Sequence, residues 1–86
     1  MTFTVVWLDS AASELAEAWL TANNRAVVTA AARNIDQRLR TSPESAGEAR
    51  EGSRRILFSG PLAVTFEPSI NDRVVRVLDV WLIEKP

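Results

Sequence analysis

The stretch that decides the fold runs from residue 54 to residue 81 and reads RRILFSGPLAVTFEPSINDRVVRVLDVW. The segments SGP (59–61) and PSIND (68–72) interrupt it with residues that favour turns. Ahead of each turn, side chains alternate with a period of two, which is typical of strands. The stretch therefore predicts a meander of three strands joined by short turns.

The last strand of this meander, residues 73–83, is almost continuously apolar and reads RVVRVLDVWLI. A strand that is covered on both faces shows such a run, whereas a strand with one wet face alternates. We therefore expect this strand near the middle of the sheet, with Trp81 on the same strand face as Asp79.

Upstream of the meander the apolar period becomes that of a helix. A polar loop, residues 42–52 with Pro43 near its start, follows a segment with one apolar stripe: Val28, Ala31, Ala32, Ile35 and Leu39. TANN (21–24) favours a turn and separates this helix from an earlier one with a second stripe: Ala12, Leu15, Ala16 and Trp19. Asp9 and Ser10 supply N-cap chemistry for the earlier helix. Two adjacent amphipathic helices predict a helical hairpin laid on a sheet.

Residues 3–8, FTVVWL, are β-branched and aromatic and predict a first strand. The element order is then β-α-α-β-β-β: an α+β fold with the helical hairpin packed on one face of a small, mainly antiparallel sheet. We expect residues 1–86 to form a single domain. The side chains expected to be buried between the layers are Leu15, Trp19, Ile35, Leu39, Leu78 and Val80.

Composition and charge narrow the class of protein. Hydrophobic residues make up 47% of the chain, which is ample for a packed core, and cysteine is absent, which fits a reducing compartment. No run approaches the roughly 20 apolar residues of a membrane helix, and the first apolar run is too short for a signal peptide, so we expect a cytoplasmic protein without a membrane partner. The net charge of -1 does not indicate nucleic acid. Residues 25–40, however, carry four arginines against one aspartate, a local basic patch that could face an acidic partner.

Much of catalytic chemistry is excluded by residue type. The chain has no histidine, tyrosine or cysteine, which rules out His-based acid–base catalysis and His- or Cys-rich zinc sites. We expect neither a metal nor a cofactor. Arginine and carboxylate remain, so Arg54 and Arg55 are candidate catalytic residues. The carboxylates that could act as a base near the sheet are Glu51, Glu67 and Asp79, and for each the alternative is an exposed or locally paired charge.

With these elements and motifs in view, the chain resembles the RelE/ParE superfamily of toxins from bacterial type II toxin–antitoxin (plasmid stabilisation) systems. The resemblance covers most of the 86 residues and rests on three ordered pieces. They are VVWLDSAASELAEAW (5–19), AAARNIDQRLRTSPESAG (30–47) and the meander stretch quoted above. The family implies the fold just predicted and a cognate antitoxin as partner.

The chain departs from the RNA-cleaving members of that family. Those members place an arginine early in the second meander strand, where this chain has Leu62 or Ala63. They also carry a His or Arg and then a Tyr after the last strand, whereas this chain ends WLIEKP at residues 81–86. Only Arg54 and Arg55 match the family's basic strand. The resemblance therefore implies the fold more firmly than a nuclease.

Three functional hypotheses remain open. In the first, the chain is a toxin-like protein that acts by protein–protein binding and is neutralised by an antitoxin. In the second, it is a ribosome-dependent mRNA endonuclease with a degenerate site. In the third, it is a toxin-derived interaction protein without toxicity. Its targets would be the ribosome with mRNA, or DNA gyrase, and a homodimer is a further alternative. The candidate partner-binding residues are Arg33, Arg40, Arg54, Arg55 and Trp81. Alternation sends Arg54 and Arg55 to opposite faces of the sheet.

Overall fold

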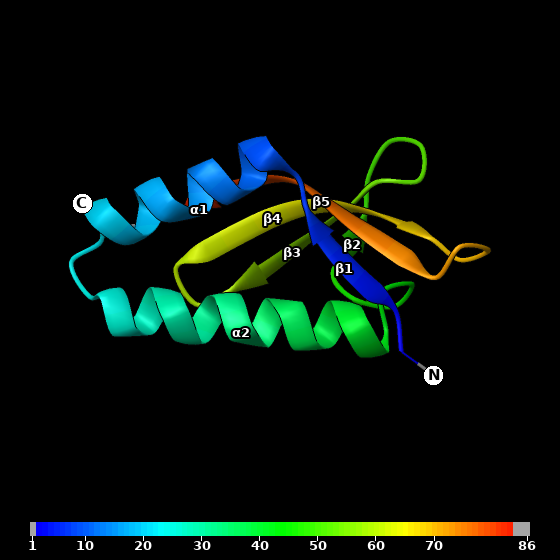
Figure 1. The fold of residues 1–86 in the computed structure, drawn as a ribbon, viewed down its shortest axis with the longest axis horizontal. Coiled ribbons are helices and arrows are strands. Elements are labelled where there is room, and N and C mark those ends of the chain that lie inside the picture. Colours follow the sequence, from blue (N-terminus) through cyan, green and yellow to red (C-terminus); the bar gives the residue numbers. More distant parts are fainter. Residues whose placement is uncertain (1, 84–86) are drawn as a thin grey trace.

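The computed structural model describes residues 2–83 and shows a five-stranded sheet with two helices on one face (Figure 1). The elements in chain order are β1 (Thr4–Trp7), α1 (Asp9–Thr21), α2 (Arg25–Thr41), β2 (Glu48–Ala49), β3 (Arg55–Ser59), β4 (Leu62–Ser69) and β5 (Val74–Leu82). The strand order is β1-β5-β4-β3-β2, with β1 parallel to β5 and the other neighbours antiparallel. The predicted α+β fold is therefore confirmed. Neither helix within residues 2–83 is long and apolar enough to cross a membrane.

Strand β5 lies between β1 and β4, the central position that its apolar sequence predicts. A β-bulge interrupts its pairing with β4, because Thr65 pairs with Asp79 whereas Phe66 pairs with Val77. Leu78 is the extra residue of this bulge and leaves the alternation of the strand. It is consequently half-buried, and its predicted place in the core is wrong, whereas Val80 is buried as expected.

Helix α2 follows its predicted stripe closely. Asn24 caps its first turn by accepting a hydrogen bond from the backbone N–H of Val27 at 3.3 Å. The buried side chains of α2 are Val28, Ala31, Ile35 and Leu39. Ala32, the fifth member of the predicted stripe, lies at the edge of the packed layer and is half-buried.

Helix α1 is rotated relative to the prediction. Its buried residues are Ala11 and Ala18, seven positions apart, whereas Leu15 is half-buried and Trp19 is 40% exposed. The expected core position of Trp19 is therefore wrong. The two small alanines let α1 lie close to the sheet, and this orientation turns the Trp19 side of the helix towards α2. The N-cap position belongs to Leu8, which makes no side-chain cap, and not to Asp9 or Ser10.

The core lies between the helices and one face of the sheet, which we call the helix-bearing face. Strands β3, β4 and β5 contribute alternate residues to it, and the largest fully buried side chain is Phe66. The strand residues in this core are Leu57, Leu62, Val64, Phe66, Val75, Val77 and Val80. The opposite face carries no helix in the described part of the chain, and we call it the open face (Figure 1).

The sequence predicts a loop over residues 42–52, whereas the structure has a short edge strand within it. Glu48 and Ala49 form β2 and pair with Ile56 and Arg55 of β3. Gly47 precedes β2 with a positive φ of 64°, and a Cβ at this position would overlap the backbone carbonyl of Ile56. A pair of residues is too short to show a period of two, so only the structure reveals this edge strand.

Candidate partner-binding groove between the helices

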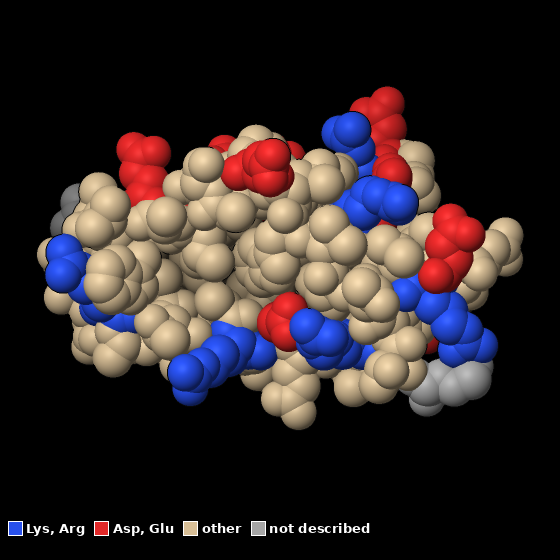
Figure 2. Space-filling model, viewed as in Figure 1, with Lys and Arg blue, Asp and Glu red and all other residues tan. Residues whose placement is uncertain are grey.

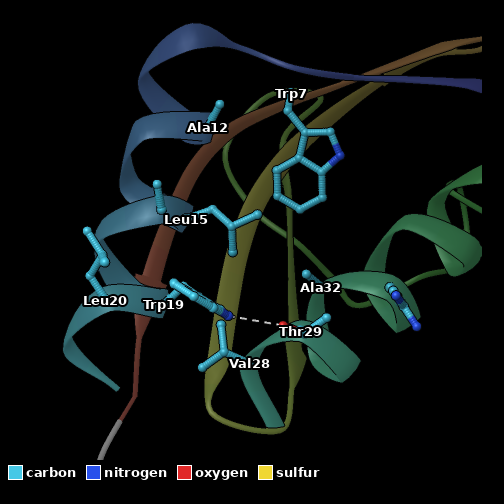
Figure 3. Close-up of a pocket in the computed structure, with 10 residues that line it drawn as sticks. Trp7, Ala12, Leu15, Trp19, Leu20, Val28, Thr29 and Ala32 are labelled. Atoms are coloured by element: carbon cyan, nitrogen blue, oxygen red, sulfur yellow. Dashed lines mark hydrogen bonds between the residues drawn. The ribbon is translucent and has the colours of Figure 1, made fainter. Parts of the chain in front are cut away.

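An open apolar groove of about 690 Å³ separates α1 from α2 on the outer side of the helix layer (Figure 3). Its walls are formed by facing residues of the two helices, and Trp7 at the end of β1 reaches into it (Figure 3). The lining residues are Trp7, Ala12, Leu15, Ala16, Trp19, Leu20, Val28, Thr29, Ala32 and Arg33. Its volume lies in the range of protein binding sites, and its lining is mostly apolar.

Trp19 marks one end of this groove and is held in a fixed orientation. Its indole Nε1–H donates a hydrogen bond to Oγ1 of Thr29 on α2, at 3.2 Å (Figure 3). The guanidinium of Arg25 stacks on the ring, 4.6 Å from its centroid. Arg25 also donates to the backbone carbonyls of Trp19 and Leu20, near the C-terminal end of α1. This exposed tryptophan is thereby pre-organised as a contact surface.

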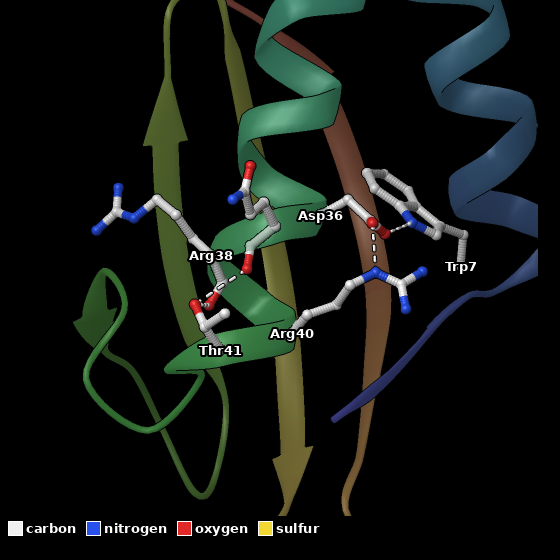
Figure 4. A network of polar contacts seen from close by, with 6 residues as sticks. Trp7, Asp36, Arg38, Arg40 and Thr41 are labelled. Carbon is white, nitrogen blue, oxygen red and sulfur yellow. Dashed lines mark hydrogen bonds and ion pairs between the residues drawn. The ribbon is translucent and has the colours of Figure 1, made fainter. Parts of the chain in front are cut away.

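Trp7 marks the other end of the groove. Its indole Nε1–H donates to Oδ1 of Asp36 on α2 at 3.3 Å, and the second carboxylate oxygen of Asp36 accepts from Nε of Arg40 at 2.7 Å (Figure 4). Asp36 and Arg40 are one helical turn apart, the spacing at which helix side chains pair. Both tryptophans of the groove are therefore fixed by side chains of α2.

The two walls of the groove differ in charge. Helix α1 carries three carboxylates and no basic residue, whereas α2 carries four arginines and a single aspartate. In Figure 2 the arginines gather along α2 and the carboxylates along the outer edge of α1, with an uncharged band between them. Glu14 turns away from the groove, since it accepts from the backbone N–H of Val80. Arg33 lines the groove and makes no hydrogen bond or ion pair with any residue in the described range, 2–83.

The five residues predicted to bind a partner fall into three separate places. Arg33 and Arg40 lie on the side of α2 that borders the groove. Arg55 pairs with Phe66 on the helix-bearing face, where its guanidinium donates to the carbonyls of Ala46 and Gly47 at 2.9 and 3.1 Å. Arg55 thus supports the loop before β2.

The open face holds the other two. Arg54 is exposed just before β3, and alternation sends it to the side opposite Arg55. Ala63 of β4 pairs with Trp81 of β5 on one side and with Phe58 of β3 on the other. Ala63 is fully buried between these two exposed aromatic side chains. The open face therefore presents an aromatic surface around Ala63.

The candidate catalytic groups are divided between the two faces of the sheet. Arg54 and Arg55 lie on opposite faces, and Glu51 is exposed in the loop between β2 and β3. Glu67 and Asp79 are on the open face, where Glu67 accepts a hydrogen bond from Ser53 at 3.0 Å. Within residues 2–83 no cluster of three or more acidic, histidine or cysteine side chains could hold a metal ion. The comparison of the chain end with the RNA-cleaving members involves residues 84–86, which lie outside the described residues.

Sequence reasoning missed the residues that shape the groove. Trp7 and Asp36 are 29 positions apart, and Trp19 and Thr29 are 10 apart, so no local pattern links the members of either pair. One signal is present in the sequence. Ala16, Trp19 and Leu20 extend the apolar surface of the first helix, which is therefore wider than the single stripe that burial against a sheet requires.

The sheet order and the helical hairpin are those of a RelE/ParE-like fold, which the superposition on two solved toxin–antitoxin structures shows. The chain superposes on the toxin–antitoxin complex RelBE2 from Mycobacterium tuberculosis with a TM-score of 0.77 at 16% identity, over 95% of this chain and 92% of that chain. For the chromosomal ParDE toxin–antitoxin system from Pseudomonas aeruginosa the TM-score is 0.66 at 16% identity, over 95% and 97% of the two chains. The resemblance predicted from the sequence is thus confirmed at the level of the fold.

The same fold also occurs within a larger protein. TrmO from Pseudomonas aeruginosa matches with a TM-score of 0.63 at 23% identity, over 92% of this chain but only 35% of that chain. Comparison with protein-family models and with curated protein sequences finds no match. The comparisons therefore establish the fold of the chain and leave its function to be inferred from the site.

Proposed function

We propose that this protein is the toxin-like component of a type II toxin–antitoxin system, acting by protein–protein binding and neutralised by a cognate antitoxin. The observation that carries the proposal is the apolar groove between α1 and α2, with both of its tryptophans fixed by α2. The neighbours in toxin–antitoxin systems, RelBE2 and ParDE, support the same class of partner. With such a partner the protein would work in the cytoplasm.

The groove suits an amphipathic helix of the antitoxin. A helix that binds a groove places apolar side chains on the floor and polar side chains at the rims. Here the floor is apolar, and the α2 rim offers Arg33, while Arg40 lies near the end marked by Trp7. Apolar anchors then supply most of the affinity, and complementary charge raises the association rate and the salt sensitivity.

We favour a protein target such as DNA gyrase over mRNA on the ribosome. The open face presents the exposed aromatic side chains Phe58 and Trp81, and its two arginines, Arg54 and Arg76, are offset by the carboxylates Glu67 and Asp79. Phosphate contacts by Lys and Arg supply much of the affinity for nucleic acid, and carboxylates oppose it. The open face is therefore poorly suited to hold an RNA backbone.

The proposal is tested by inducible expression in a bacterial host, with and without the reading frame adjacent to this gene. We expect growth arrest on induction of this protein alone and recovery when the adjacent protein is produced as well. Normal growth under both conditions, with the protein present in the soluble fraction, would contradict the toxic role and favour a toxin-derived interaction protein.

RNA cleavage provides a separate prediction. We expect translating extracts supplied with the purified protein to keep their mRNA intact, because Arg54 and Arg55 lie on opposite faces of the sheet and the chain has no histidine or tyrosine. Primer extension on a reporter mRNA measures this directly. Cleavage that disappears in an Arg54→Ala variant would instead establish the nuclease alternative.

Charge reversal at Arg33 tests the α2 rim. Arg33→Glu is expected to weaken binding of the adjacent protein by about tenfold or more at low salt, because it replaces attraction to a carboxylate with repulsion. Arg38→Glu is the matched control, since Arg38 is an exposed arginine of the same helix that points away from Asp36 and Trp7 (Figure 4). Titration at two salt concentrations is the measurement, and equal losses in both variants would argue against a specific role for Arg33.

A further inference from the structure

We infer that the groove contains a socket for two bulky apolar side chains, one helical turn apart on a partner helix that also directs a carboxylate at Arg33. This socket is the space between Trp7 and Trp19, above the alanines of the two helices. The inference rests on the proposed function and adds the chemistry by which the partner is recognised. The socket has three parts: its two ends, its floor and its rim.

The ends of the socket are set by α2. Thr29 accepts the indole N–H of Trp19, and Asp36 accepts that of Trp7. These acceptors are seven positions apart on one helix, which is two turns or about 10 Å along its axis. Side chains at positions i and i+4 of a partner helix are about 6 Å apart along its axis, so one such pair fits between the two rings.

The floor of the socket is made of small residues. Ala12 and Ala16 line it from α1, one turn apart, and Ala32 lines it from α2. Figure 3 shows Ala12 and Ala32 on the facing helices. A side chain that ends at Cβ leaves the space beside it open, and Leu15 and Val28 form the deeper surface below. Large aliphatic or aromatic side chains of a partner would fill this space and be desolvated on both sides. Such pockets are where binding energy concentrates in protein interfaces.

The rim supplies the charge. Arg33 lies four positions after Thr29 and three before Asp36, on the same side of α2, and therefore midway along the socket. Its guanidinium pairs with no other side chain among residues 2–83. The facing wall, α1, carries no basic residue. A partner helix complements both walls when its carboxylate lies beside the apolar pair and faces α2. The same helix in the reverse direction would place that carboxylate over α1, which carries no basic residue.

The experiment fills the socket without disturbing the core. Ala16→Leu replaces a methyl group by an isobutyl group at an exposed helix position that lines the groove, and Ala30→Leu makes the same replacement at an exposed position of α2 outside it. Affinity for the protein encoded by the adjacent reading frame is measured for both variants and for the unmodified chain. We expect Ala16→Leu to lose at least about tenfold in affinity and Ala30→Leu to stay within about twofold. Denaturation curves confirm that both variants remain folded.

Each of the other possible results would contradict either the socket, the proposed function or the identity of the bound partner. If Ala16→Leu binds as tightly as the unmodified chain while Arg33→Glu does not, the socket is wrong although partner binding at this face stands. If the unmodified chain binds nothing from the adjacent reading frame and causes no growth arrest, the proposed function fails and the socket fails with it. If sedimentation shows that the protein dimerises and that Ala16→Leu abolishes the dimer, the occupant is a second copy of this chain and the inferred antitoxin helix is wrong.

Discussion

Replacement of Phe66 by alanine is expected to lower the free energy of unfolding by about 3–5 kcal/mol, the range found for large aromatic side chains removed from protein cores. Phe66 is the largest of the fully buried side chains and has an exposure of 0%. It belongs to β4 at the position of the bulge, where Val77 is its partner on β5. Its removal opens a cavity in the core between the sheet and the helices.

Phe58→Ala is the matched control for this loss. Phe58 belongs to the neighbouring strand β3 but lies on the open face and is 51% exposed. Its truncation removes far less buried surface, so we expect a change of about 1 kcal/mol or less. Chemical denaturation of both variants measures the difference. Equal losses would mean that the assignment of the two faces of the sheet is wrong.

The second large effect concerns the partner. Trp19→Ala is expected to weaken binding of the adjacent protein by at least about 2 kcal/mol, or about 30-fold, as is found when a tryptophan that anchors an interface is truncated. The indole is already fixed by Thr29 and Arg25 before binding, so little side-chain freedom is lost when a partner packs on it.

Trp81→Ala is the matched control for Trp19→Ala. The two tryptophans have nearly equal exposures, 39% for Trp81 and 40% for Trp19, but Trp81 lies on the open face. We expect its truncation to leave the affinity within about threefold, because a residue outside the interface contributes little to binding. Isothermal titration calorimetry compares the two variants. A larger loss at Trp81 would transfer the partner to the open face.

Much of the fold is readable from the sequence because its signals are local. The stripe of α2 from Val28 to Leu39 combines large residues at a regular period, so both the helix and its buried side are evident. Helix α1 is different, because its buried residues Ala11 and Ala18 are small and carry little hydrophobic signal. The heavier residue Trp19 dominates its pattern and points to the wrong side.

The groove could be predicted only in part. The arginines of α2 are visible in the sequence as a cluster, and Arg33 and Arg40 do lie beside the groove. The apolar surface depends on contacts between elements, such as that of Trp7 with Asp36, which no spacing along the chain reveals. For the same reason, the hydrogen bonds of Arg55 to the loop before β2 became visible only in the folded chain.

The central claim is that the antitoxin binds between α1 and α2, and the three tryptophans of the chain test it in one spectrum. Their indole N–H groups each give a separate NMR resonance in protein labelled with nitrogen-15. Trp7 and Trp19 line the groove, whereas Trp81 lies on the open face. On addition of the protein encoded by the adjacent reading frame, the resonances of Trp7 and Trp19 should shift while that of Trp81 stays in place. A shift confined to Trp81 would contradict the account, since it would put the partner on the opposite face of the sheet.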